Sequence, residues 1–182
     1  VLDDGGCWSP DGEDLAFSSQ SSGNLGSRDL WRMTANGNSA QRLTNGDFED
    51  RDPDWHNNGI VFSRRPLNSS DPARLFVLDP VSTNISPITD GGANEGDYEP
   101  AWAPDGESVL FIRRASSDLQ VLMRYVLGTS KPVVISDGTG IDRFPRWSPQ
   151  GDRIFVARSR PVLGLDGLRL YGTMPDGSDP LL

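Results

Sequence analysis

Cysteine, histidine and lysine are almost absent from this sequence. Its 182 residues include one of each, namely Cys7, His56 and Lys131. A single cysteine excludes an intrachain disulfide, so cysteine usage does not identify the redox compartment. One cysteine and one histidine are also too few for an ordinary zinc site. No uninterrupted apolar run approaches the roughly 18 residues of a membrane-spanning helix.

The usual catalytic motifs are missing as well. The sequence contains no G-x-S-x-G elbow, and no glycine-rich phosphate loop is followed by a lysine. His56 occupies a turn, so a histidine-based triad has no partner that converges on it. A paired-carboxylate hydrolase is the one catalytic alternative, and its candidate residues are Glu49, Asp50, Asp52, Asp97 and Glu99. We expect no intrinsic catalysis.

Negative charge and turn-forming residues are plentiful. The formal net charge of −9 repels phosphate backbones and anionic headgroups, so we expect neither nucleic-acid binding nor membrane insertion. Cations and basic protein surfaces are better partners for such a chain. Twenty glycines and fourteen prolines without a collagen period are typical of short strands joined by tight turns, which predicts an all-β protein.

Four tryptophans divide the chain into repeats. The spacings between successive members are 47, 47 and 45 residues, a period at which propeller blades of four strands occur. In three of the repeats the tryptophan precedes a turn of the S-P-D-G kind, in which proline pre-sets φ and glycine adopts a left-handed conformation. The four residues are Trp8, Trp55, Trp102 and Trp147.

Alternating apolar residues follow each turn and predict the second strand of each repeat, with one face packed against a neighbouring blade. The pairs are Leu15 and Phe17, Ile60 and Phe62, Val109 and Phe111, and Ile154 and Val156. A third strand follows, for example Leu30 to Met33, and then a short fourth strand, for example Gln41 to Thr44.

These residues resemble the TolB-type propeller repeat. The shared unit is P-x-W-S-P-D-G, two apolar residues on the next strand, an L-Y/W-x-M-like strand and a closing L-T-x-G. The resemblance implies an all-β β-propeller with four four-stranded blades, at about residues 1–46, 47–93, 94–139 and 140–182. Two departures stand out. Gly6 replaces the first proline, and blade two is two residues shorter and has His56-Asn57-Asn58 in place of S-P-D. We therefore expect an irregular hairpin in blade two.

The number of blades bears on the rest of the protein. TolB-like propellers have six blades, so we expect a single propeller domain or a part of one, cut from a longer chain. The alternatives are a closed four-bladed ring and two chains joined into one ring. An open arc would expose an apolar flank at each end, with Leu15 and Phe17 in blade one and Ile154 and Val156 in blade four. Self-association or binding of the missing blades would cover them.

The repetition of the tryptophans at one blade position favours a packing role for them over a stacking platform for sugars or bases. Four aspartates also recur, each five residues before a tryptophan: Asp3, Asp50, Asp97 and Asp142. They lead into the innermost strand, so we expect their carboxylates to ring one mouth of the channel. Such a ring would hold Ca²⁺ or attract a lysine or arginine of a partner. The alternative is that each aspartate accepts backbone N–H bonds and orders its own loop.

Long loops are expected between the second and third strands of each blade, at 18–29, 64–74, 113–119 and 158–168. Antiparallel connectivity places them on the face where each first strand begins. Binding commonly uses long loops on a rigid scaffold, so this face is the predicted partner site. The alternative is salt bridging between neighbouring blades. The arginines at the loop starts are Arg64, Arg65, Arg113, Arg114, Arg158 and Arg160.

Two functions follow from the resemblance. The first is a non-catalytic binding module that engages a protein partner, as TolB does in the bacterial periplasm or cell envelope. The second is the substrate-filtering propeller of a prolyl-oligopeptidase-like or tricorn-like peptidase whose catalytic domain lies outside this chain. Neither implies a cofactor other than the Ca²⁺ considered above.

Overall fold

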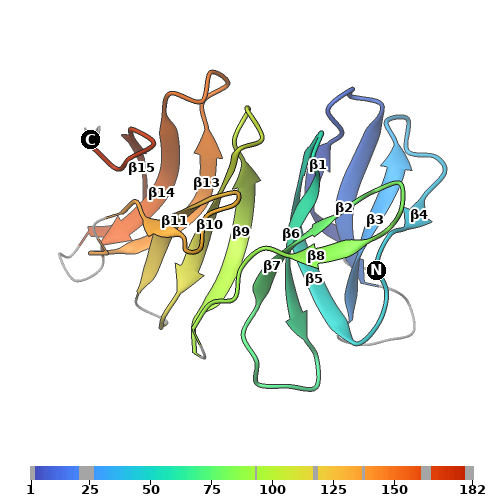
Figure 1. The fold of residues 1–182 in the computed structure, drawn as a ribbon, viewed down its shortest axis with the longest axis horizontal. Coiled ribbons are helices and arrows are strands. Elements are labelled where there is room, and N and C mark those ends of the chain that lie inside the picture. The colour runs from blue at the N-terminus through green and yellow to red at the C-terminus, as the bar shows by residue number, and fades with distance from the viewer. Residues whose placement is uncertain are drawn as a thin grey trace. The chain divides into compact units, whose positions relative to one another are not determined.

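The computed structural model describes residues 3–20, 27–92, 94–116, 119–136, 138–160 and 165–178. Every regular element in these segments is a β-strand (Figure 1). The described residues include no helix that is long and apolar enough to cross a membrane. The chain divides into two compact units, Val1–Pro100 and Ala101–Leu182.

The first unit holds two antiparallel four-stranded groups, which correspond to blades one and two. A single parallel bridge, Arg28 to Glu49, joins the groups into one sheet. Blade one consists of β1 (Asp3–Trp8), β2 (Asp14–Gln20), β3 (Arg28–Thr34) and β4 (Gln41–Arg42). Blade two consists of β5 (Phe48–His56), β6 (Gly59–Pro66), β7 (Arg74–Leu78) and β8 (Ile85–Pro87).

The second sheet follows the same plan. Its members are β9 (Gly96–Trp102), β10 (Ser108–Arg114), β11 (Gln120–Val126), β12 (Val133–Val134), β13 (Ile141–Trp147), β14 (Ile154–Arg160) and β15 (Leu165–Thr173). Strand β9 begins in the first unit and continues into the second. Strands β9 to β12 form blade three, and β13 to β15 form the described part of blade four. Residues 179–182, where the sequence predicts the last outer strand to end, lie outside the described residues.

The hairpin turns follow the repeat. In blade one, the Ser9 hydroxyl accepts a hydrogen bond from the Asp14 N–H at 2.9 Å and donates one to Asp11 at 2.6 Å. Blade two has a two-residue turn instead, because His56 pairs directly with Gly59. Gly59 has φ +118°, and a Cβ there would lie 2.7 Å from the Leu78 carbonyl oxygen. The predicted irregular hairpin is therefore confirmed.

A threonine or serine hydroxyl at the end of each of the first three repeats explains their closing motif. Thr44 Oγ1 accepts a hydrogen bond from the Leu30 N–H at 2.9 Å, and Thr89 Oγ1 accepts one from the Leu75 N–H at 3.0 Å. Ser136 plays the same part in blade three. The backbone donors of the third strands are thereby satisfied where the fourth strand ends.

Apolar packing between neighbouring blades forms one core in each unit. Ala16, Leu30 and Leu43 of blade one pack on a group from blade two that includes Ile60 and Phe62. In the second unit, residues of blade three pack on Ile154 and Val156 of blade four, together with Trp147 and Tyr171.

The expectation that Ile154 and Val156 line an exposed flank is wrong. Both side chains are buried because they face blade three. Leu170 of blade four is 69% exposed instead, whereas its counterpart Leu30 in blade one is fully buried. In blade one, Trp8 is 55% exposed, and its repeat counterpart Trp102 is buried.

A left-handed residue stands three positions before each repeat tryptophan. The four residues are Gly5, Asp52, Glu99 and Phe144, with φ between 53° and 55°. The pairing register shifts here in β1, β5 and β13, so this residue forms a bulge in the first strand of those blades. Three of the four carry a side chain in a conformation that glycine adopts most easily.

Candidate functional site

Two of the repeated aspartates, Asp50 and Asp142, form ion pairs inside their blades. Asp50 on β5 lies opposite Arg64 on β6 in the strand register. Arg64 donates from Nε to Asp50 Oδ1 at 2.7 Å and from Nη2 to Asp50 Oδ2 at 2.8 Å. Asp50 is fully buried, and the Arg64 side chain is 10% exposed. Both oxygens of this carboxylate are therefore occupied.

The same arrangement recurs in blade four. Arg158 donates from Nε to Asp142 Oδ1 at 2.5 Å and from Nη2 to Oδ2 at 3.1 Å. Asp142 Oδ2 also accepts the Leu122 N–H at 3.2 Å, which ties blade four to blade three. The guanidinium of Arg158 lies over the ring of Tyr171, 5.2 Å from its centroid. This aspartate therefore stabilises the contact between two blades.

Of the other two aspartates, Asp97 is as deeply buried as Asp50, and Asp3 departs from this pattern. Asp97 is fully buried, and its N–H donates to the Ala73 carbonyl at 3.0 Å. Asp3 is exposed and stands opposite Ser19, so blade one has a serine where blades two and four have an arginine.

For Asp50, Asp97 and Asp142, these positions correct the expectation that the aspartates are open to a cation or partner, while Asp3 is exposed. Asp50 and Asp142 are buried members of ion pairs, and Asp97 is buried as well. Among the described residues, no group of three or more His, Cys, Asp or Glu side chains is arranged to hold a metal ion. The geometry favours the salt-bridge alternative, with the difference that both bridges lie within a blade.

The named arginines lie on strands and not at the starts of loops, which corrects the expected loop boundaries. Strand β6 extends to Pro66, and β10 and β14 extend to Arg114 and Arg160. Arg113 stacks over the ring of Phe111 at 5.4 Å, and Arg114 is half-buried. The side chain of Arg160 lies outside what the structure describes.

Arg65 belongs to a more exposed network around Glu49. Arg65 Nη2 lies 2.6 Å from Glu49 Oε2, and Arg51 Nη2 lies 2.5 Å from Oε1. Burial raises the pKa of Glu49, but the hydrogen bonds and charges of the two arginines outweigh it, so the pKa is lowered. Arg51 also reaches Asp4 of blade one at 3.3 Å. This contact is a salt bridge between neighbouring blades, but Arg51 is not one of the arginines for which the sequence suggested such a bridge.

In contrast to Glu49, the carboxylates of Asp52 and Asp29 have raised pKa values. Burial, followed by the nearby charge of Glu99, raises the pKa of Asp52, and a backbone hydrogen bond at Glu99 opposes them. Burial also raises the pKa of Asp29, while Arg42, whose Nη2 lies 2.7 Å from Asp29 Oδ2, lowers it. Each of these carboxylates is harder to ionise in the folded protein than in water.

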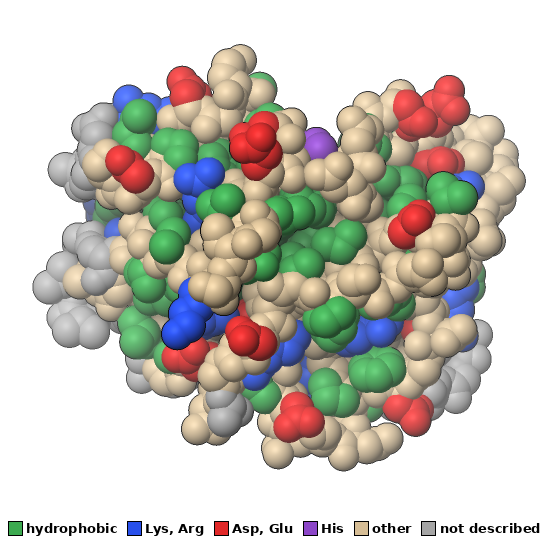
Figure 2. All heavy atoms as spheres, viewed as in Figure 1, with side chains coloured by type: hydrophobic (Ala, Val, Ile, Leu, Met, Phe, Trp, Pro, Cys, Tyr) green, Lys and Arg blue, Asp and Glu red, His purple; other side chains and the backbone are tan. Residues whose placement is uncertain are grey.

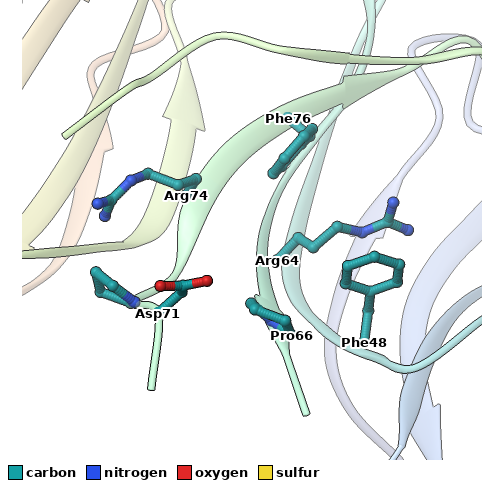
Figure 3. A pocket seen from close by; sticks show the side chains of 7 residues that line it. Phe48, Arg64, Pro66, Asp71, Arg74 and Phe76 are labelled. Atoms are coloured by element: carbon teal, nitrogen blue, oxygen red, sulfur yellow. The ribbon is translucent and has the colours of Figure 1, made fainter. Parts of the chain in front are cut away.

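A pocket of about 420 Å³ opens on blade two, and we call it the blade-two pocket. It lies where β5 begins, β6 ends and β7 begins, which is the face predicted for binding. Figure 3 shows the Arg64 side chain beside the ring of Phe48 and the Asp71 carboxylate directed into the space below Phe76. The lining residues are Phe48, Arg64, Pro66, Asp71, Pro72, Arg74 and Phe76.

Both arginines of the pocket are held in place. Arg64 lies 4.5 Å from the centroid of Phe48 and 5.6 Å from that of Phe76, in addition to its pair with Asp50. Arg74 donates to the carbonyl oxygens of Ala73 at 3.0 Å and Gly92 at 2.7 Å. The pocket therefore has rigid cationic and aromatic walls.

Of the pocket residues, only Arg64 was singled out as a site residue from the sequence. Phe76 reads as an ordinary strand residue, and Asp71 and Pro72 lie in a loop whose path the repeat does not define. On the described part of the face in Figure 2, acidic and basic side chains are interspersed with no broad patch of one sign. His56 was predicted to occupy a turn, but it is the last residue of β5, directly before the two turn residues 57–58, and its Nδ1 accepts the Asn58 N–H at 3.3 Å.

Known structures have the same fold as this chain. The TolB of Acinetobacter baumannii superposes with a TM-score of 0.76 at 18% identity, over 96% of this chain and 41% of that one. A puromycin hydrolase superposes with a TM-score of 0.74 at 12% identity, over 99% of this chain and 28% of the enzyme. These likenesses establish the fold alone.

Sequence comparison gives the family. The Tol-Pal system protein TolB of Alcanivorax borkumensis is 24% identical over 101 residues, 56% of this chain. The chain spans only 39% and 23% of the lengths of the curated relatives that it matches. The family model described as the TolB beta propeller domain matches residues 3–162. The chain therefore belongs to the family of TolB beta propeller domains.

Proposed function

We propose that this chain is a non-catalytic binding module of the bacterial periplasm or cell envelope, and that it engages a protein partner through its long-loop face. By this face we mean the ends of the blades where the first strand begins and the second strand ends. The observation that carries the proposal is the blade-two pocket, which opens on this face. Its aromatic and proline walls and few polar groups are typical of recognition sites.

The opposite ends of the blades support the choice of face. They carry short turns closed by their own hydrogen bonds, such as Thr34 Oγ1 to Asn36 Oδ1 at 2.7 Å. Such turns offer few side chains for a partner, because their polar groups already bind one another.

The residue inventory supports a role without catalysis. His56 has its Nδ1 committed to the hairpin, and the buried aspartates Asp50 and Asp142 are bound to arginines. A general acid or base must be within reach of a substrate, which these groups are not. We expect no turnover of peptide, ester, glycoside or phosphate substrates.

The four blades, at about residues 1–46, 47–93, 94–139 and 140–182, are proposed to be part of a single propeller. The exposed positions of Trp8 and Leu170 support this, because the counterparts of Leu170 in other blades are buried and those of Trp8 are buried or partly buried. Each would be covered by a further blade or by another copy of the chain.

The substrate-filtering propeller of a peptidase is the second candidate, and the likeness to a puromycin hydrolase favours it. The two proposals differ in what lies beyond this chain. A serine hydrolase domain in the parent protein would support the peptidase, and a small α/β domain would support the binding module.

Site-specific photocross-linking in the native host tests the proposed face. A photoreactive residue at Arg65 or Ala115 should cross-link a protein partner. The same residue at Asn36 or Val81, in turns of the opposite face, serves as the control and should give no such product. Cross-links from the control positions alone would contradict the proposal.

A further inference from the structure

We propose that the blade-two pocket binds an aromatic side chain with a hydrogen-bond donor, tyrosine or tryptophan, of the protein partner. The inference rests on the proposed function, because the pocket lies on the long-loop face. It adds the type of side chain that this part of the face selects.

The charges of the pocket are balanced, so they favour neither a cation nor an anion. Arg64 and Arg74 line it together with a single carboxylate, that of Asp71. Arg64 is bound in turn to the buried carboxylate of Asp50, with contacts of 2.7 and 2.8 Å. Two guanidiniums and two carboxylates leave no net charge for a charged side chain to match. An uncharged side chain is therefore the better occupant.

Arg74 keeps its positive charge, but most of its donors are already used. Its Nη1 and Nη2 donate to three backbone carbonyl oxygens, those of Ala73, Gly92 and Glu95. These bonds hold the guanidinium in place without cancelling its charge. A Cβ at Gly91 would lie 2.7 Å from Arg74 Cζ, closer than to Nη1 at 2.8 Å or Nε at 3.0 Å, so Gly91 packs over one face of the guanidinium. What Arg74 can present to the pocket is therefore its stem and its opposite face.

The walls of the pocket suit an aromatic ring. Apolar surface surrounds a cavity of about 420 Å³, and the residues that supply it are Phe48, Pro66, Pro72 and Phe76. A guanidinium attracts the face of an aromatic ring, because the ring quadrupole is negative there. A ring in the pocket would therefore bury its apolar area on the phenylalanines and prolines, and its face would attract the charge of Arg74.

Asp71 supplies an acceptor for the polar end of such a ring. It is exposed and lines the pocket, and its backbone N–H donates to Ser69 Oγ at 3.0 Å. Within the described residues its carboxylate has no hydrogen-bond or ion-pair partner. In Figure 3 this carboxylate points toward the interior of the pocket. Buried tyrosine and tryptophan side chains usually donate their O–H or N–H to a partner, and Asp71 is placed to accept it.

The test uses pentapeptides of sequence acetyl-Gly-Ser-X-Ser-Gly-amide, in which X is tyrosine, tryptophan, phenylalanine, cyclohexylalanine, lysine or glutamate. Binding to the ¹⁵N-labelled chain is measured by NMR titration, and the amides of residues 64–76 should shift. Phenylalanine lacks the donor, so the tyrosine and tryptophan peptides should bind about fivefold more tightly than the phenylalanine peptide, as for one hydrogen bond. Cyclohexylalanine has a similar size but no aromatic face, so the phenylalanine peptide should bind about threefold more tightly than the cyclohexylalanine peptide, as for an exposed cation–π contact.

Asp71→Ala should bring the affinity for the tyrosine peptide down to that for the phenylalanine peptide. The affinity for the phenylalanine peptide itself should not change, because that peptide has no donor for the carboxylate. Glu107→Ala is the matched control, because it removes a carboxylate from an exposed site in the other unit, and it should leave both affinities unchanged. Both variants are at exposed positions, so their folded spectra provide the check on integrity.

Several results would overturn the inference: equal affinity for tyrosine and phenylalanine, equal affinity for phenylalanine and cyclohexylalanine, preference for lysine or glutamate, no binding of any peptide, or equal effects of Asp71→Ala and Glu107→Ala. None of these affects the cross-linking test of the long-loop face. If cross-links come from that face while the peptides fail, the proposed function stands and the aromatic-side-chain inference falls.

Discussion

Replacing Asp50 by asparagine removes one charge from a buried ion pair and leaves the other in place. Arg64 would lose two charge-assisted hydrogen bonds of 2.7 and 2.8 Å while its side chain is only 10% exposed. Removal of one partner of a buried pair typically lowers the free energy of unfolding by about 3–5 kcal/mol. The stacking of Arg64 on Phe48 survives, so we expect a loss near the lower end, about 3 kcal/mol.

Urea denaturation followed by tryptophan fluorescence measures the loss. Arg65→Met is the matched control, because it removes a charge from the same strand. Arg65 is 46% exposed, and Glu49 keeps its bond to Arg51. The free energy of unfolding of the Arg65→Met variant should therefore fall by less than about 1 kcal/mol. The double variant Asp50→Leu/Arg64→Met removes both charges, and much of the stability should return. An Asp50→Asn variant no less stable than Arg65→Met would refute the claim that this pair is structural.

Three further predictions follow from other parts of the fold. Asp52→Asn should raise the free energy of unfolding at pH 7, because the raised pKa of Asp52 shows that its ionised form is unfavourable in the folded state. This gain in stability should disappear below about pH 4, where the carboxyl is protonated in the folded and the unfolded state. Equal gains at both pH values in urea titrations would contradict this. Thr89→Val should cost about 1–2 kcal/mol in the same assay, because the buried Leu75 N–H loses its acceptor, and a neutral effect would show that this bond is not needed. Leu170→Lys should reduce self-association in light scattering, because that side chain is 69% exposed on an apolar flank; unchanged association would exclude this flank.

The repeat predicted most of the fold. The tryptophan period located the four blades, and the alternation at Ile60 and Phe62 identified the second strands, because hydrophobic periodicity and turn residues act locally. Which end flank is covered was harder to predict. Ile154 and Val156 were expected on an open flank. Alternation with a period of two assigns residues to the two faces of a strand, but it does not show which neighbouring blade each face contacts.

The ion pairs were predictable in principle. Asp50 and Arg64 are 14 residues apart, and Asp142 and Arg158 are 16 apart, so each pair lies symmetrically about its hairpin. Blade two lacks two residues, which accounts for the difference. Residues at this spacing lie opposite each other in the strand register and so contact each other. The aspartates and the arginines were instead interpreted as two separate sets of site residues.

The blade-two pocket was not predictable from the repeat. Asp71 and Pro72 reach it through the loop between β6 and β7, and Arg74 is fixed by carbonyl oxygens of the segment before β9. Neither loop conformation follows from propensity or from the period. Binding sites on variable loops are the part of a repeat fold that the repeat does not specify.

The central claim is that the long-loop face binds a protein partner. Once cross-linking has identified that partner, hydrogen–deuterium exchange of the chain with and without it measures the bound surface directly. We predict slower exchange on binding at residues 64–76, with no change in the turns at 35–38 and 80–84. Protection confined to those turns, or protection absent from 64–76, would contradict the account.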